Sequence, residues 1–228
     1  LWMLDEYETL AGGHYPGFIT GKPIGMGGSL GRTEATGFGV VYHIREALKR
    51  LNLDIRGMTA AFQGFGNVAQ YAAKLFRELG GRVLSVSCWD GADNVPYVFR
   101  RKDGVDPDFL LSITDGYGAI DKDKARDAGY ELLPGDQWVS QEAEILVPCA
   151  LENQLNGDTV RNISGRVKLV AEGANGPTTR EADEVLKAQK IYVIPDFLCN
   201  SGGVTCSYFE QVQANMNFYW EKEEVLNR

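Results

Sequence analysis

The chain has 228 residues, of which 44% are hydrophobic, and its 23 basic and 31 acidic side chains give a net charge of −8 at pH 7. This length and apolar content support one large domain, or two small ones, with a sizeable core. The acidic balance and the lack of a basic cluster argue against nucleic acid or an anionic membrane surface as the main partner. The chain contains no apolar run of about 18 residues, so no transmembrane helix is predicted.

The four cysteines show no C-x-x-C spacing, and only two histidines accompany them. This composition argues against a zinc site. We expect Cys88, Cys149, Cys199 and Cys206 to be free buried thiols, and the protein to work in the reducing cytoplasm.

Residues 1–8 have an amphipathic helical pattern without the basic start of a signal peptide. Residues 12–31 are rich in glycine, which predicts a connector. A helix with Thr33 as its N-cap is predicted to end before Gly57, because its apolar side chains recur on one face. Residues 220–226 continue a helical pattern without a C-cap. Since both ends fall inside helices, we expect the chain to be a piece of a longer protein.

Short apolar stretches alternate with amphipathic ones along the rest of the chain. Strands are predicted at 58–63, 82–87, 143–148, 167–171 and 191–194, with a short extra strand at 95–99. Helices are predicted at 67–79, 106–117, 122–128 and 157–163, after the capping box Thr178–Glu181, and after Gly202-Gly203. This alternation predicts right-handed crossovers and an α/β fold with a doubly wound, mostly parallel sheet.

The turn after the first predicted strand carries the motif G-x-G-x-x-A, formed by Gly64, Gly66 and Ala69. The first glycine permits a tight turn, the second lets the backbone approach a pyrophosphate, and the alanine keeps the helix close to the sheet. The start of that helix offers free N–H groups to phosphates. The motif therefore predicts a Rossmann-type NAD(P)-binding domain over residues 32–228, preceded by an inter-domain helix and connector over residues 1–31 and truncated at its C-terminus.

Ligands of such a sheet bind at the carboxyl ends of its strands, so the turns after the strands form the candidate site. These turns, with the segment around Thr36, resemble the cofactor-binding domain of the hexameric, NAD-dependent glutamate dehydrogenases of the amino-acid dehydrogenase family. The matching segments are GGSLGRTEATG at 27–37, QGFGNVA at 63–69, PCAL at 148–151, AEGAN at 171–175 and NSGGVTCS at 200–207. They follow in family order over nearly the whole chain.

The resemblance implies which residues contact the cofactor. Near the pyrophosphate they are Gly64, Phe65, Gly66, Asn67 and Val68, of which Asn67 and Val68 offer backbone N–H groups. Beside the adenosine they are Cys149 and Ala150, and at the nicotinamide they are Arg32, Thr36, Asn175 and Asn200. Without the resemblance, Thr36 is as well explained by support of a helix start as by cofactor binding. Asn175 is then better explained by a turn with Gly176 than by cofactor binding.

The same resemblance implies that Ser207 binds the γ-carboxylate of the substrate and that Val204 lies beside it. Without the resemblance, Ser207 would be a hydroxyl on a helix face. No segment of the type G-G-x-K or P-x-P-D occurs, so the lysines and the aspartate that the family uses for catalysis are expected in another domain. We therefore expect no catalytic residue in this chain.

The second predicted strand is followed by Cys88-Trp89-Asp90-Gly91, the place where dinucleotide-binding domains carry an acidic residue for the ribose. Asp90 could bond the ribose hydroxyls, or it could begin a turn. No Lys or Arg lies between Val83 and Phe99 to pair with a 2′-phosphate. This absence predicts NAD as the cofactor in preference to NADP.

The implied activity is the oxidative deamination of L-glutamate to 2-oxoglutarate and ammonia by hydride transfer to NAD. This piece alone is expected to bind the cofactor without turnover, because the cleft that holds both reactants needs the second domain. The alternatives are a dehydrogenase for branched-chain or aromatic amino acids, which the Ser207 hydroxyl disfavours, and a non-catalytic NAD(H)-binding regulatory module. The resemblance implies a homohexamer for the full-length protein and leaves open a monomer for this piece.

Overall fold

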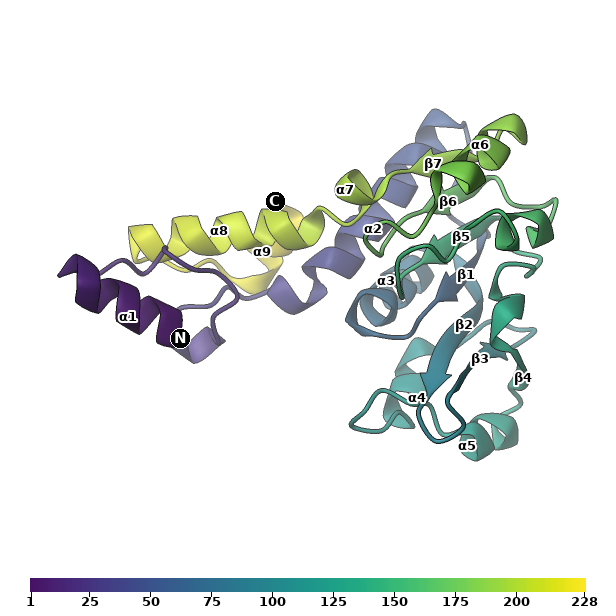
Figure 1. Ribbon diagram of the computed structural model, residues 1–228, viewed down its shortest axis with the longest axis horizontal. Coiled ribbons are helices and arrows are strands. Elements are labelled where there is room, and N and C mark those ends of the chain that lie inside the picture. Colours follow the sequence, from purple (N-terminus) through teal and green to yellow (C-terminus); the bar gives the residue numbers. More distant parts are fainter.

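The structure is a computed structural model that describes residues 1–228. At its centre is a seven-stranded sheet with the order β4-β3-β2-β1-β5-β6-β7 (Figure 1). The strands are β1 (Thr59–Gln63), β2 (Arg82–Asp90), β3 (Val95–Arg100), β4 (Glu131–Pro134), β5 (Ile145–Pro148), β6 (Leu169–Ala171) and β7 (Tyr192–Ile194). All pairings among β2, β1, β5, β6 and β7 are parallel, whereas β3 pairs antiparallel with both β2 and β4. The prediction of a mostly parallel sheet is confirmed.

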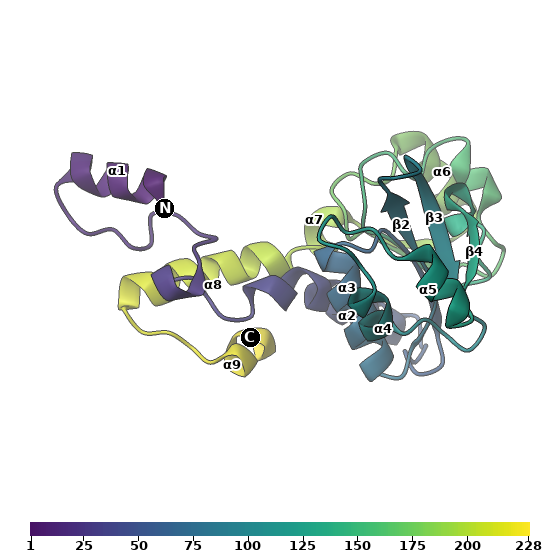
Figure 2. The same cartoon turned by 90° about the horizontal axis from the view of Figure 1, so that it is seen from below.

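Side chains of β1 alternate between two cores, one on each face of the sheet. Ala60 and Phe62 join a large cluster with residues of α2 (Arg32–Arg50) and α3 (Asn67–Glu78). Ala61 joins a second cluster with residues of α6 (Arg180–Ala188). Helices therefore cover both faces (Figure 2), as the doubly wound fold requires.

The other helices are shorter or lie away from the sheet. They are α1 (Trp2–Ala11), α4 (Pro107–Ser112), α5 (Lys122–Asp127), α7 (Asp196–Cys199), α8 (Gly202–Met216) and α9 (Lys222–Asn227), with 3-10 turns η1 (Ile24–Met26), η2 (Gly135–Trp138) and η3 (Thr159–Asn162). The helix predicted to reach Tyr117 ends at Ser112, because Asp115 accepts the N–H groups of Tyr117 and Ala119 and holds a turn. The strand predicted to end at Ser87 continues to Asp90.

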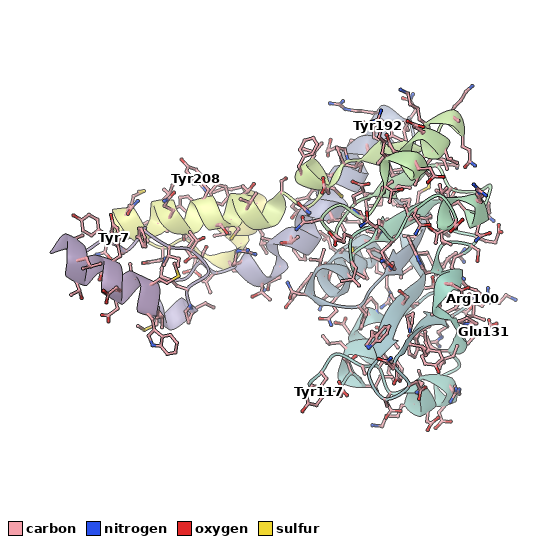
Figure 3. The ribbon with its side chains drawn as sticks, in the orientation of Figure 1. Tyr7, Arg100, Tyr117, Glu131, Tyr192 and Tyr208 are labelled. Atoms are coloured by element: carbon pink, nitrogen blue, oxygen red, sulfur yellow. The ribbon has the colours of Figure 1, made fainter.

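The predictions missed β4, which lies at the edge of the sheet and is short. It is held by its pairing with β3 and by an ion pair of 2.5 Å between Arg100 and Glu131, which face each other across the two strands (Figure 3). Its four residues end in Pro134, which has no N–H for a further ladder bond. Such a segment lacks the alternating pattern by which a strand is recognised.

Two predicted helix caps were wrong by one or two residues. Gly31, not Thr33, is the cap of α2, and its φ of 79° is a backbone conformation that glycine adopts readily. Thr179, not Thr178, caps α6 by accepting the N–H of Ala182 at 3.3 Å. In neither case does the spacing of apolar residues specify which residue begins the helix.

Helices α1, α8 and α9 form an arm that projects from the sheet (Figures 1 and 2). The N-terminal connector is fixed to α8 by a buried ion pair of 2.9 Å between Lys22 and Glu210, whose side chains are almost inaccessible to solvent. Glu210 also accepts the backbone N–H groups of Gly21 and Lys22. The arm thus joins the two ends of the chain, while the domain boundary at residue 31 stays a prediction.

No helix combines the length and the apolar character that crossing a membrane requires. All four cysteines are free thiols; Cys88, Cys199 and Cys206 are buried and Cys149 is half-buried.

Replacing Glu210 with glutamine should destabilise the arm strongly. The Lys22 ammonium would lose its only carboxylate while staying buried, so we expect the free energy of unfolding to fall by about 3 kcal/mol or more. Urea denaturation followed by circular dichroism measures this change. The control is Glu224→Gln on α9, whose exposed pair with Arg228 is expected to contribute about 0.5 kcal/mol or less. Equal effects of the two substitutions would contradict the burial of the Lys22 pair.

Candidate functional site

The glycine turn lies between the end of β1 and the start of α3, as the motif predicts. Gly64 has a φ of 94°, and a Cβ there would lie 3.2 Å from the Cβ of Ala150, in the turn after β5. Its N–H donates to the Ser87 hydroxyl of β2 at 3.0 Å. Phe65 turns its side chain into the core, so only its backbone faces the turn. The turn is therefore fixed to both neighbouring strands.

The first N–H groups of α3 are left without a side-chain cap. Gly66 is the N-cap, and the space next to its Cα is open, since a Cβ there would meet nothing within 4 Å. The Asn67 side chain is turned away, because it donates to the Thr33 carbonyl at 2.7 Å. An open helix N-terminus with unpaired N–H groups fits a phosphate group.

A cavity of about 640 Å³ opens at the carboxyl ends of β5 and β6, beside the starts of α3 and α8. Nine residues predicted from the sequence line it: Arg32, Thr36, Val68, Cys149, Ala150, Asn175, Asn200, Val204 and Ser207. The structure thus gathers residues from five separate segments at one place. Glu152 also lines the cavity and was not predicted; its position just after the PCAL segment could have indicated it.

Arg32 and Ser207 meet at the end of the cavity nearest the arm. The Arg32 Nε donates to the Ser207 hydroxyl at 3.2 Å, and that hydroxyl lies 3.2 Å from the Gly203 carbonyl. A Cβ on Gly203 would overlap the Thr36 hydroxyl and lie 3.4 Å from the Arg32 guanidinium. Glycine at position 203 is therefore required for the close approach of α8 to these two side chains.

Asn175 and Asn200 come from the turns after β6 and α7. The Asn200 side-chain amide donates to the Asn175 side-chain oxygen at 2.7 Å. Gly176, with a φ of 55°, turns the chain next to Asn175, and its N–H donates to Asp196 at 2.8 Å. Asn175 is thus part of a turn and also faces the cavity, so the two alternatives for this residue do not exclude each other.

Cys149 contributes an uncharged wall to the cavity. Burial raises the pKa of its thiol to about 12, so the group is a neutral thiol at pH 7 and a poor nucleophile. A Cβ on Gly173 would lie 2.5 Å from the Cys149 sulfur, so the glycine makes room for it.

Asp90 does not line this cavity. Its carboxylate accepts the N–H groups of Ala92 and Asp93, both at 2.9 Å, and forms an ion pair of 2.8 Å with Lys122. Lys122 is the main reason why the pKa of Asp90 lies below its usual range. The structure therefore has Asp90 in a turn, and its contact with a ribose stays a prediction. The fold also places a cation, Lys122, at the end of β2, although the stretch from Val83 to Phe99 contains no Lys or Arg.

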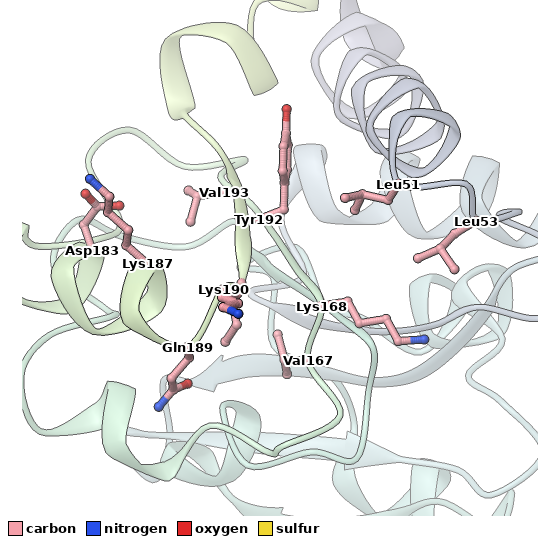
Figure 4. A pocket seen from close by; sticks show the side chains of 11 residues that line it. Leu51, Leu53, Val167, Lys168, Asp183, Lys187, Gln189, Lys190, Tyr192 and Val193 are labelled. Atoms are coloured by element: carbon pink, nitrogen blue, oxygen red, sulfur yellow. The ribbon is translucent and has the colours of Figure 1, made fainter.

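A second cavity, of about 680 Å³, lies near the amino ends of β6 and β7. None of the predicted site residues lines it. In Figure 4 its lysines do not converge: Lys187 lies beside Asp183, whereas Lys168 points toward Leu53. Of these two cavities, only the first is therefore lined by residues that the sequence predicts to bind cofactor or substrate.

Comparisons with known proteins identify the family of the chain. The family model for Glutamate/Leucine/Phenylalanine/Valine dehydrogenase matches residues 27–228. The chain is 42% identical over 224 residues to the cryptic catabolic NAD-specific glutamate dehydrogenase GudB of Bacillus subtilis, covering 98% of this chain and 49% of the relative. It is 41% identical to the NAD-specific glutamate dehydrogenase of Staphylococcus aureus, covering 98% of this chain and 51% of that protein.

Solved structures of glutamate dehydrogenases are similar to the chain in fold as well as in sequence. Glutamate dehydrogenase from Peptoniphilus asaccharolyticus has a TM-score of 0.80 and 38% identity, covering 99% of this chain and 50% of that one. The hetero-hexameric glutamate dehydrogenase from Thermus thermophilus has a TM-score of 0.85 and 34% identity, covering 100% of this chain and 51% of that one. The chain thus spans about half the length of the relatives it matches. It belongs to the glutamate/leucine/phenylalanine/valine dehydrogenase family.

Proposed function

We propose that this chain is the cofactor-binding half of an NAD-dependent glutamate dehydrogenase, which converts L-glutamate to 2-oxoglutarate and ammonia. The observation that carries the proposal is the cavity in which Thr36, Asn175, Asn200 and Ser207 meet beside the start of α3. An NAD(H)-sensing module would need the glycine turn but not this group of polar side chains. The names of the relatives, which are NAD-specific, support NAD.

The pyrophosphate of the cofactor would bind at the turn from Gly64 to Val68. The open space at Gly66 and the free N–H groups of Asn67 and Val68 fit two phosphates that carry negative charge. Ala150 and Cys149 would form an apolar wall beside the adenosine. When bound, NAD supplies the acceptor for the hydride of the amino acid.

The nicotinamide end would lie against Thr36, Asn175 and Asn200. Hydroxyl and amide groups both donate and accept, so they can bond a carboxamide and fix which ring face meets the substrate. The bond between Asn200 and Asn175 holds both side chains in place before a ligand arrives. These residues therefore orient the cofactor rather than react.

The side-chain carboxylate of glutamate would bind at Ser207, with Val204 beside it. Arg32 supports this assignment, since its guanidinium touches the Ser207 hydroxyl and brings positive charge to the same end of the cavity. A site with a hydroxyl and a guanidinium disfavours the aliphatic and aromatic side chains of leucine, valine and phenylalanine. Glutamate is therefore the proposed substrate.

The groups that activate water and bind the α-carboxylate would belong to a second domain. The only cysteine at the cavity, Cys149, is a neutral thiol, and no lysine lines the cavity. Hydride transfer requires both reactants at near-attack distance, which a cleft between two domains provides. The whole protein would work in the cytoplasm as a homohexamer, in which each half of a subunit supplies one wall of the cleft.

Titration with NADH and NADPH, followed by nicotinamide fluorescence, tests the proposal directly. We expect NADH to bind residues 1–228 at least roughly tenfold more tightly than NADPH, a difference of about 1.4 kcal/mol. Failure of both to bind would contradict the assignment of the glycine turn. Tighter binding of NADPH would contradict the choice of NAD.

Replacing Gly203 with alanine should weaken NADH binding by roughly tenfold or more, because the new methyl group would displace the Thr36 hydroxyl. Fluorescence titration measures the dissociation constant. Gly165→Ala serves as the control, since a Cβ at that exposed loop glycine would meet nothing within 4 Å. If the two variants bind NADH equally well, Thr36 does not contribute to the cofactor site.

Residues 1–228 alone should not oxidise glutamate. With L-glutamate and NAD present, we expect no formation of NADH above background in an absorbance assay, although NADH binds. Measurable turnover would show that this half already contains the catalytic groups.

A further inference from the structure

Three charged side chains, Asp90, Asp93 and Lys122, lie together at the end of β2. The proposed function assigns a role to Asp90 alone. Lys122, the first residue of α5, forms an ion pair of 2.8 Å with Asp90, the last residue of β2. The same ammonium group pairs with Asp93 in the turn that follows. The ring of Tyr97, on β3, lies beneath it, with 5.1 Å between Nζ and the ring centroid. We call Asp90, Asp93, Lys122 and Tyr97 the Lys122 cluster.

Hydrogen bonds to neighbouring groups hold the side chains of the Lys122 cluster in place. Asp90 accepts two backbone N–H groups of its own turn, and the Tyr97 hydroxyl donates to Asp93 at 2.7 Å. The antiparallel pairing of β2 with β3 sets Tyr97 opposite Cys88, two residues before Asp90. The two carboxylates keep the pKa of Lys122 above its usual value and its ammonium charged. Two carboxylates and one ammonium leave a net charge of −1 in this place.

The Lys122 cluster lies where a Rossmann-type domain meets the adenosine ribose. Ser87, which binds the N–H of Gly64, is three residues before Asp90 on the same strand. Three residues of a strand span about 10 Å, so the cluster lies just beyond the glycine turn. In such domains the end of the second strand contacts the ribose, whose 2′-position carries a hydroxyl in NAD and a phosphate in NADP.

Resting on the proposed function, we propose that the Lys122 cluster selects the cofactor. Lys122 is a cation that could pair with a 2′-phosphate, and Asp90 and Asp93 together occupy it. A phosphate of charge about −2 would meet a net negative cluster, whereas a ribose hydroxyl would meet carboxylate acceptors. Selectivity therefore depends on Asp93 as well as on the terminal acid of β2. Removing Asp93 alone would free part of the Lys122 charge for a phosphate.

The test measures the binding of NADH and NADPH to the full chain and to variants by fluorescence. Adenosine 2′,5′-bisphosphate and adenosine 5′-monophosphate, titrated by calorimetry, repeat the comparison without the nicotinamide. Asp93→Asn keeps the shape of the side chain and its acceptor for Tyr97. We expect this variant to shift the NADPH/NADH affinity ratio toward NADPH roughly tenfold, the order of effect of one nearby charge. Lys122→Met should shift the ratio in the opposite direction.

Asp123→Asn is the matched control. Asp123 follows Lys122 directly, is exposed and pairs with Arg126, so its replacement removes the same formal charge without touching Lys122. It should leave the ratio unchanged within about twofold, since exposed charges are screened by salt. The double variant Asp93→Asn/Lys122→Met should lose the gain of the first substitution.

Three results would overturn the proposal. They are equal ratios for Asp93→Asn and Asp123→Asn, a gain that persists without Lys122, and an unchanged ratio in Lys122→Met. The last also decides the case if Asp93→Asn does not fold, which thermal unfolding by circular dichroism would reveal. Binding of neither dinucleotide to the unchanged chain would refute the proposed function instead, so the two failures are distinguishable.

Discussion

Close contact between the backbones of α2, α3 and α8 fixes the geometry of the candidate site. A Cβ on Gly37 would lie 2.7 Å from the Val68 carbonyl of α3, and a Cβ on Gly39 would lie 2.9 Å from the Cα of Gly202 in α8. Only glycine permits both approaches, so α2 can touch the two helices at once. Because Thr36 lies directly before Gly37 and three residues before Gly39, its hydroxyl is set beside the starts of both helices. A shift of any one helix would disperse the cavity.

Four polar side chains of the cavity form two hydrogen-bonded pairs. Arg32 binds Ser207, and Asn200 binds Asn175, each through one hydrogen bond. Such pairs hold the side chains in one arrangement, which lowers the entropy lost when a ligand replaces or joins them. They also satisfy polar groups that would otherwise be costly to shield from water.

The cavity has little positive charge, although the proposed cofactor is an anion. Arg32 is the only basic residue that lines it, and the chain as a whole has a net charge of −8. In the proposed site, attraction for phosphates would therefore come from backbone N–H groups and the dipole at the start of α3. Full positive charges near a dinucleotide would not discriminate against an extra phosphate, whereas oriented amides bind the pyrophosphate that both cofactors share. Under the proposed function, the choice between NAD and NADP would then depend on the end of β2.

The amino-acid sequence by itself determined the parts of the protein that depend on neighbours along the chain. Short apolar runs specified the central strands, which are buried on both faces, and the spacing of Gly64, Gly66 and Ala69 specified the turn into α3, because both patterns are local in the chain. Only the tertiary structure decided what meets Asp90. Its partner Lys122 is 32 positions away and arrives through the packing of α5, so the absence of a basic residue from 83–99 did not describe that site. The arrangement of the arm also depends on tertiary structure. Its ion pair between Lys22 and Glu210 joins opposite ends of the chain, so no local sequence pattern indicates it.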